Sequence, residues 1–358
     1  MTYSAIGLMS GSSLDGLDII LAEFSESQGQ WAYKIKAADC TRFSAKLKSR
    51  LANAIHLPAN EYMLLHTDFA RWCGEKTNEF LKENKIRKKP QIIGSHGHTT
   101  FHIPERGMTH QLGDGATIAA ITGVPVVSDL RNTDVALGGQ GAPIVPIGEK
   151  LLFPSYQYFL NIGGISNVSI HQKRKVIAFD VCPANRVLNL LAGIIGKSYD
   201  KDGQIAAKGK VNQTVLEKLN QLKYYSKAYP KSLPNSFGTD TLFPLLTQSE
   251  LSIPDALATC TEHIAQQIFK SLLPFSGKPG KILITGGGAH NNQLIARIKY
   301  YLDNIQIQVT LPSNEVIDNK EALIMAFIAV LRLRGEANVL SSVTGSSRDN
   351  SGGALWQP

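Results

Sequence analysis

Residues 4–24 read SAIGLMSGSSLDGLDIILAEF, and this stretch decides the fold. Two apolar runs, 4–9 and 17–24, flank a turn of small and polar residues. Apolar runs joined by a short turn rich in Gly, Ser and Asp are typical of a β-hairpin. The sequence therefore predicts two antiparallel strands with a glycine turn between them.

The same pattern occurs again about half a chain further on. The apolar run that begins at Tyr158 leads into Gly163-Gly164-Ile165-Ser166-Asn167 and ends at Ile170. Two such hairpins in one chain indicate an internal duplication. The length of 358 residues also exceeds what one hydrophobic core usually serves. We therefore expect two domains, 1–150 with 334–358 and 151–333.

Outside the hairpins, strand-like runs alternate with helical periodicity, which predicts an α/β fold. The expected strands are 91–94, 124–128, 176–179 and 281–285, and the expected helices are 61–81, 185–193, 256–273 and 321–333. The last helix is apolar almost all round, so we expect it to be buried between the domains. The tail from 341 to 358 ends in apolar residues and should pack.

Composition excludes several classes of protein. The formal charge of +8 is spread thinly, and its densest run, 85–89, lacks the interleaved aromatic residues of a nucleic-acid site. No run of about 18 apolar residues predicts a membrane span, and 1–8 does not resemble a signal peptide. Single, scattered cysteines do not suggest zinc or disulfides. We expect a cytoplasmic protein without nucleic-acid or membrane partners.

The turn of the first hairpin suits a phosphate group. Where glycines lack side chains, backbone N–H groups approach an anion closely, and hydroxyls add donors. An ordinary hairpin turn is an equally good interpretation. Asp15 and Asp18 would hold Mg²⁺ through its water molecules. The candidate phosphate-binding residues are Gly11, Ser12, Ser13, Leu14, Asp15, Gly16 and Asp18.

Two further glycine turns have a similar composition. Gly163 and Gly164 form the second turn, and Gly286, Gly287 and Gly288 follow the strand-like run 281–285. Ligands of open α/β sheets collect at the carboxyl ends of the strands. The sequence contains no G-x-x-x-x-G-K-[ST] motif and no protein-kinase catalytic loop.

Three more positions are candidates for chemistry. Asp180 follows the run 176–179 and precedes a helix, so it is placed either for catalysis or to favour the helix N-terminus. Arg131 would clamp a carboxylate, or pair with Asp129 or Asp134. His98 and Thr99 would shape a pocket rim, since metal ligation needs a converging cluster that the sequence does not offer.

Taken together, these motifs resemble the anhydro-N-acetylmuramic acid kinase family over nearly the whole chain. The resemblance implies two related actin-like/RNase H-like domains of the actin, Hsp70 and sugar-kinase superfamily, with ATP in the cleft between them, and a homodimer. The matching segments are 6–18 (IGLMSGSSLDGLD), 95–99 (SHGHT), 137–143, 161–167 (NIGGISN), 285–288 (TGGG), 343–345 and 351–353.

The resemblance also implies a reaction and a role for each residue. ATP phosphorylates O6 while water opens the 1,6-anhydro ring of the sugar, which gives N-acetylmuramic acid 6-phosphate and ADP. Asp180 would be the general base, Gly11 to Asp18 would hold the phosphates and Mg²⁺, and Arg131 and Glu321 would contact the sugar.

This chain departs from the family at Asp180-Val181-Cys182-Pro183-Ala184-Asn185, where the family more often has Asp-Thr-Gly-Pro-Gly-Asn. Two alternatives remain at this point. One is a kinase of the same superfamily that acts on another amino sugar through a free hydroxyl. The other is an ATPase of the actin or Hsp70 kind that phosphorylates no sugar.

Overall fold

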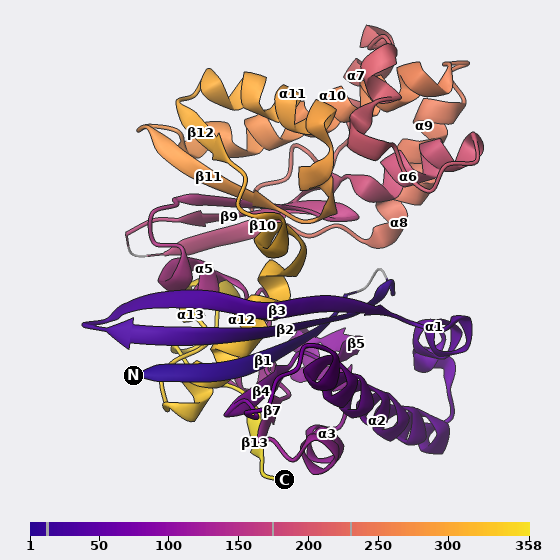
Figure 1. The fold of residues 1–358 in the computed structure, drawn as a ribbon. Coiled ribbons are helices and arrows are strands. Elements are labelled where there is room, and N and C mark those ends of the chain that lie inside the picture. Colours follow the sequence, from indigo (N-terminus) through magenta and orange to yellow (C-terminus); the bar gives the residue numbers. More distant parts are fainter. Residues whose placement is uncertain (12–13, 174, 230) are drawn as a thin grey trace. The chain divides into compact units, whose positions relative to one another are not determined.

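The computed structural model describes residues 1–11, 14–173, 175–229 and 231–358, which form two compact units. The first unit contains Met1–Pro154 and Asn319–Pro358, and the second contains Ser155–Asp318. Each is a β-sheet with helices packed against it (Figure 1). The second unit is thus shorter than the expected range 151–333, because residues 319–333 pack with the first sheet.

The first unit is built on a six-stranded sheet in the order β13-β7-β4-β1-β2-β3. The predicted hairpin is confirmed, since β1 and β2 pair antiparallel from Thr2↔Ser25 to Ser10↔Leu17. β4 and β7 then extend the sheet in parallel. The strands are β1 (Thr2–Ser10), β2 (Gly16–Ser27), β3 (Gln30–Arg42), β4 (Ile92–Ser95), β7 (Val126–Ser128) and β13 (Ala354–Trp356), with a separate hairpin of β5 (His98–Ile103) and β6 (Met108–Leu112).

Helices of this unit follow the expected apolar periodicity. The longest, α2, buries Leu65, Phe69 and Phe80 along one face, as the pattern in 61–81 predicts. Together with the inner faces of β1 and β2 these residues form the core. The helices are α1 (Ala45–Ala52), α2 (Ala59–Glu83), α3 (Gly115–Thr122), α4 (Asn132–Ala136), α5 (Pro146–Leu152), α12 (Asn314–Leu333) and α13 (Ser341–Thr344).

From residue 319 onward, α12 lies directly on the first sheet. A Cβ atom on Gly7 of β1 would be 1.8 Å from the carbonyl oxygen of Ala322, and one on Gly94 of β4 would be 2.1 Å from that of Met325. Only glycine allows a helix backbone to approach two strands so closely. Burial of this helix was predicted, and its partner is the sheet of the first unit.

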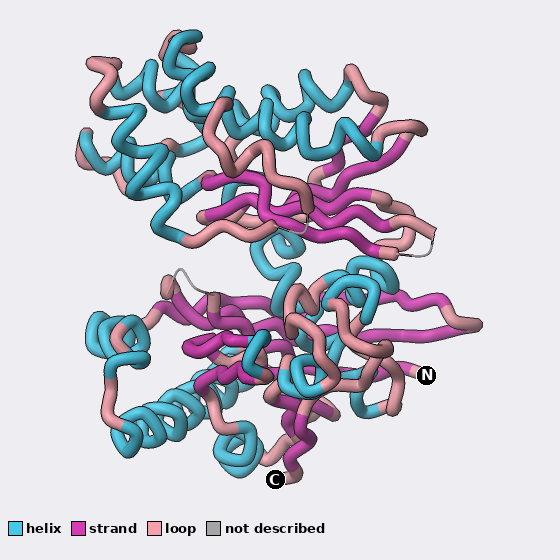
Figure 2. The backbone as a smooth tube through the Cα atoms, turned by 180° about the vertical axis from the view of Figure 1, so that it is seen from behind, coloured by secondary structure: helices cyan, strands magenta, loops and turns pink. Residues whose placement is uncertain are grey.

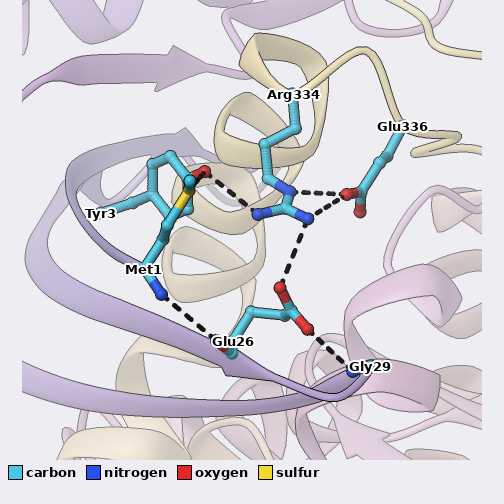
Figure 3. A network of polar contacts seen from close by, with 6 residues as sticks. All are labelled: Met1, Tyr3, Glu26, Gly29, Arg334 and Glu336. Atoms are coloured by element: carbon cyan, nitrogen blue, oxygen red, sulfur yellow. Dashed lines mark hydrogen bonds and ion pairs between the residues drawn. The ribbon is translucent and has the colours of Figure 1, made fainter.

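The end of α12 is also tied to the first hairpin. Arg334 donates to the hydroxyl of Tyr3 at 3.0 Å and to Glu26 at 3.5 Å, and it pairs with Glu336 at 2.5 Å (Figure 3). Its guanidinium also lies 5.1 Å from the centre of the Trp31 ring. The contacts of Arg334 with Tyr3, Glu26 and Trp31 join residues more than 300 positions apart, so the last 40 residues complete the unit that the first residues begin.

The second unit repeats the sheet plan of the first. Its order β10-β9-β8-β11-β12 has three antiparallel strands followed by two parallel ones, as in β3-β2-β1-β4-β7. This identical order supports the predicted duplication. The strands are β8 (Tyr158–Ile162), β9 (Ile165–His171), β10 (Val176–Pro183), β11 (Gly280–Thr285) and β12 (Ile307–Thr310).

Helices of the second unit lie on one side of its sheet, as Figure 2 shows. α10 is the central one and is buried along most of its length between α6, α7 and α11. The helices are α6 (Asn185–Ile194), α7 (Gln213–Asn220), α8 (Asn235–Phe237), α9 (Phe243–Thr247), α10 (Ile253–Leu272) and α11 (Asn292–Asp303), with a π-helical turn at Gly238–Leu242 and short 3₁₀ turns elsewhere.

Candidate active site

The first glycine turn connects β1 and β2 as predicted. Leu14 N–H donates to the carbonyl of Gly11 at 3.3 Å, and Leu14 itself has a φ of 56°. A leucine in the left-handed region is uncommon, and such conformations cluster at ligand sites. The predicted contributions of Ser12 and Ser13 lie outside the described residues. A phosphate-binding role for this turn stays a prediction.

Asp18 lies on β2 between two neighbouring strands, opposite Met9 and Cys40. Burial and a hydrogen bond to Asp18 raise the pKa of the Cys40 thiol to about 12. Asp15 is mostly exposed, with its carboxylate 4.0 Å from Lys48.

These two carboxylates have the chemistry for Mg²⁺ bound through water. Among the described residues no group of three or more His, Cys, Asp or Glu side chains gathers to enclose a metal ion. Mg²⁺ commonly keeps several waters and takes only one or two carboxylates together with phosphates. The donor set therefore fits a water-mediated ion at Asp15 and Asp18 and does not fit a closed metal cage.

Arg131 makes its hydrogen bonds inside the first unit. Its guanidinium donates twice to His96 Nε2, at 2.7 and 3.2 Å, and once to the carbonyl of Gly141 at 2.7 Å. These bonds go to neither Asp129 nor Asp134, the partners considered from the sequence. They use three of the five guanidinium donors, so two N–H groups remain for contacts beyond those with the described residues.

Glu321 belongs to a cluster of charged groups around the start of the buried part of α12. Burial raises the pKa of its carboxyl group, Asp18 and Glu149 raise it further, and the positive charges of Lys320 and Arg131 oppose this. Glu321 therefore interacts electrostatically with both Asp18 and Arg131. The structure brings together three residues that the sequence assigned to phosphate, metal or sugar.

The remaining rim residues of this unit lie on β5. His98 is 6% exposed, and its Nδ1 lies 3.3 Å from Ser10 Oγ at the end of β1. Thr99 is exposed. His98 thus lies at the carboxyl end of β1, where the glycine turn begins.

In the second unit, Asn185 connects the two glycine turns. Its N–H donates to the carbonyl of Gly163 at 3.0 Å, and its Nδ2 donates to that of Ile162 at 3.1 Å. A Cβ atom on Gly288 would lie 3.0 Å from Asn185 Oδ1. No role was predicted for Asn185 from the sequence, although its position just after the strand of Asp180 was a usable signal.

Gly286 requires glycine for two reasons. Its φ is 83°, and a Cβ atom there would lie 2.4 Å from Asn161 Oδ1. β11 thus ends in a turn whose backbone lies against β8. The expected turn at the carboxyl end of this strand is confirmed, and its contact with ATP stays a prediction.

Asp180 lies within β10, which continues to Pro183, so the expectation that it follows the strand is corrected. The pairing of β10 with β9 shifts between Asp180 and Cys182, which is a β-bulge. Bulges re-aim side chains next to active sites. Since α6 begins only after Ala184, Asp180 is not in the first turn of that helix.

Burial raises the pKa of the Asp180 carboxyl group above its usual value near 3.8. The N–H of Leu233 donates to Asp180 Oδ2 at 2.8 Å and acts in the opposite direction. A half-buried carboxylate with a raised pKa is suited to general-base catalysis nearer neutral pH.

A cavity of about 490 Å³ adjoins the glycine turn of β11. Its size is in the usual range for small-molecule sites. It was not foreseen from the sequence, because its wall combines α6, the loop after α6 and the turn at 287–291. The lining residues are Asn185, Leu188, Asn189, Tyr199, Asp200, Lys201, Asp202, Gly287, His290 and Asn291.

Two sheets of the same strand order, each with glycine turns, define a two-domain α/β protein of the actin-like fold. Component A of (R)-2-hydroxyglutaryl-CoA dehydratase from Acidaminococcus fermentans shares this fold, with a TM-score of 0.50, 14% identity and coverage of 91% of this chain and 97% of that one. Residues 3–358 match the family "Anhydro-N-acetylmuramic acid kinase", and the chain belongs to that family.

Relatives with an assigned name match over nearly their full length. A protein of Aliivibrio fischeri named anhydro-N-acetylmuramic acid kinase is 36% identical, with 98% of each chain covered. A Vibrio cholerae protein of the same name is 34% identical over 99% of this chain and 98% of its own. This protein is therefore a carbohydrate kinase. Within the described residues, no helix combines the length and apolarity needed to cross a bilayer.

Proposed function

We propose that this protein is an ATP-dependent kinase of cell-wall recycling in the cytoplasm. It opens 1,6-anhydro-N-acetylmuramic acid with water and phosphorylates O6, so that ATP, the bridged sugar and water give ADP and N-acetylmuramic acid 6-phosphate. The observation that carries the proposal is the family match over residues 3–358 together with the half-buried Asp180.

Asp180 is the base in this proposal. Its carboxylate takes a proton from the water that attacks the anomeric carbon, C1. The C1–O6 bond then breaks, and O6 becomes the nucleophile for the γ-phosphoryl group. Ring opening thus produces the attacking oxygen at the moment phosphoryl transfer needs it.

Phosphate binding is assigned to the glycine turns, and nucleoside binding to the cavity. The glycine turns at Gly11–Gly16, Gly163–Gly164 and Gly286–Gly288 take the phosphates, and the 490 Å³ cavity beside Gly287 takes the nucleoside. Asp15 and Asp18 would hold Mg²⁺ through water, and the ion would neutralise charge on the transferring phosphoryl group.

Sugar contacts are assigned to His98, Thr99, Arg131 and Glu321. Arg131 offers its two remaining N–H groups to the carboxylate of the sugar, while His96 and Gly141 hold its plane in place. Glu321, whose pKa is raised by burial, is assigned to the side of the anhydro bridge.

The homodimer that the family resemblance implies is also a proposal. Leu190, Ile194 and Ile195 are 38%, 53% and 45% exposed at the end of α6. An exposed apolar group of this kind suits an interface between copies. Sedimentation velocity over a range of concentrations measures the association.

Two experiments test the proposed reaction: one follows the oxygen of the attacking water, and the other removes the proposed base. In H₂¹⁸O, the early product should carry one ¹⁸O at C1, since only hydrolytic opening places solvent oxygen there. Mass spectrometry reads the label, and authentic N-acetylmuramic acid 6-phosphate kept in the same water corrects for exchange. Asp180→Asn should lower kcat about 10²-fold or more while ADP still binds, because the amide accepts no proton.

The matched control is Asp303→Asn, at an exposed aspartate that ends α11, which should keep the wild-type rate. Turnover of open-ring amino sugars alone would instead indicate a kinase of another sugar. ATP hydrolysis that no amino sugar changes would contradict sugar phosphorylation altogether.

A further inference from the structure

Asp180 lies on the outer edge of its sheet, and a loop covers that edge. β10 is the last strand of the order β10-β9-β8-β11-β12. The loop between α7 and α8, here called the Tyr224 loop, comprises residues 221–229 and 231–234. It supplies partners for the main chain and the side chain of Asp180.

Three hydrogen bonds join this loop to Asp180. The N–H of Asp180 donates to the carbonyl of Lys231 at 3.1 Å, and the hydroxyl of Tyr224 donates to the carbonyl of Asp180 at 2.7 Å. The N–H of Leu233 donates to the carboxylate oxygen Oδ2 at 2.8 Å. Since three groups of one residue are fixed from one loop, the direction of the carboxylate depends on that loop.

The loop residues that make these bonds are themselves held by aromatic contacts. The ammonium group of Lys231 lies 4.7 Å from the centre of the Tyr224 ring and 5.8 Å from that of Phe179, the residue before Asp180. The Tyr224 ring also contacts Phe237, with centroids 5.6 Å apart. A cation over an aromatic ring is attracted by the negative face of that ring, so these contacts hold Lys231 and Tyr224 together.

We propose that Tyr224 and Lys231 are positioning residues for the reaction, which fix the Asp180 carboxylate in the direction from which it activates water. The proposal rests on the function proposed above, in which Asp180 is the base. Its physical reason is that a base must be aligned with its proton, and a misplacement of about 1 Å costs on the order of 10²-fold in rate. The β-bulge next to Asp180 does not by itself fix the alignment of the carboxylate, so this alignment depends on the Tyr224 loop.

A double-mutant cycle tests whether Tyr224 acts through Asp180. Tyr224→Phe removes only the hydroxyl and keeps the ring under Lys231. In the otherwise wild-type enzyme it should lower kcat about 10-fold while both KM values change less than about 2-fold. In the Asp180→Asn enzyme, the same substitution should change the residual rate by less than about 2-fold, because there is no longer a base to align.

The second variant and the controls separate positioning from folding. Lys231→Arg should keep most of the activity, since a guanidinium also stacks on aromatic rings, whereas Lys231→Met should lower kcat several-fold. Tyr229→Phe, in the same loop and stacked on Phe179 at 5.8 Å, should leave kcat unchanged. Thermal midpoints of all variants report folding independently of rate.

The outcomes distinguish this inference from the proposed function. An unchanged kcat for Tyr224→Phe, or equal losses in both backgrounds, overturns the positioning role while the effect of Asp180→Asn leaves the base assignment standing. Wild-type rates in Asp180→Asn, or a product without ¹⁸O, overturn the proposed function and the positioning role together.

Discussion

Two histidines in this chain are kept neutral by burial. The pKa of His96 falls to about 3 because of burial and the charge of Arg131. The pKa of His263 falls to about 3 because of burial, with a smaller effect of Lys270. His263 is fully buried in α10, where its two ring nitrogens lie 2.9 Å from Asn220 Oδ1 and 2.9 Å from the Tyr225 hydroxyl. Both rings therefore have partners as neutral imidazoles.

His263 should make the second unit lose stability in acid. Between its folded pKa of about 3 and its ordinary value near 6.5, the unfolded chain binds a proton that the folded chain does not. Stability therefore falls as the pH falls through this window, by about 2 kcal/mol from this residue at pH 5. His263→Gln should remove that part of the loss between pH 7.5 and 5, measured by urea unfolding.

The control for this prediction is His56→Gln, at an exposed histidine, which should leave the pH dependence as it is. An equal loss of stability in the wild type and in His263→Gln would show that His263 carries no such linkage.

Some residues of the candidate site could be located from the sequence, and others could not. Asp180 and the glycine turns stand next to strand-like runs, so local pattern located them. Asn185 and Tyr224 act through contacts with residues 23 and 44 positions away, respectively, in chain order. No local pattern encodes such pairs, and for that reason the positioning of Asp180 could not be predicted from the sequence.

At the scale of elements, α5 and α12 are joined by a buried ion pair. Lys320 Nζ lies 2.7 Å from Glu149 Oε1, and the two side chains are 3% and 4% exposed. Removing two charges from water costs free energy. The attraction between the two charges offsets this cost only while both partners are present. The charge of Lys320 also acts on the neighbouring Glu321.

Breaking this pair on one side should destabilise the first unit strongly. Glu149→Gln or Lys320→Met should each lower the free energy of unfolding by about 3–5 kcal/mol, because a buried charge loses an ion-pair partner 2.7 Å away. The double variant should lose much less than the sum of the two. Urea unfolding of the three variants measures the coupling between them.

A partly exposed pair provides the comparison. Lys76 and Glu79 on α2 are 2.6 Å apart with side chains 27% and 55% exposed, so Glu79→Gln should change stability by less than about 1 kcal/mol. Additive losses at Glu149 and Lys320 would mean that the two side chains stabilise the fold independently.

Helices whose apolar residues recur at a regular helical spacing could be predicted from the sequence, whereas some strands could not. α2, α6 and α10 occur where apolar spacing placed them, with ends within a few residues. β3 was missed although its side chains largely alternate between exposed and partly buried, because this edge strand buries none of them fully and has no continuous apolar run. The hairpin of β5 and β6 was missed for a similar reason, since polar residues fill it.

At the scale of the molecule, the two units differ in how the chain builds them. The first needs both ends of the sequence, whereas the second is one continuous segment, Ser155–Asp318, with its own core. The two hairpins revealed the duplication in the sequence. They did not reveal where the chain returns to the first unit, because that depends on the contact of α12 with Gly7 and Gly94.

A continuous segment with its own core should fold alone. Residues 155–318, expressed separately, should unfold cooperatively, and ADP should raise their thermal midpoint in a concentration-dependent way, because the 490 Å³ cavity lies wholly inside this segment. Asn189→Trp, at an exposed position on the cavity wall, should abolish the ADP effect and keep the fold. An unfolded fragment would show that this core depends on the first unit, and a folded fragment indifferent to ADP would exclude the cavity as the nucleoside site.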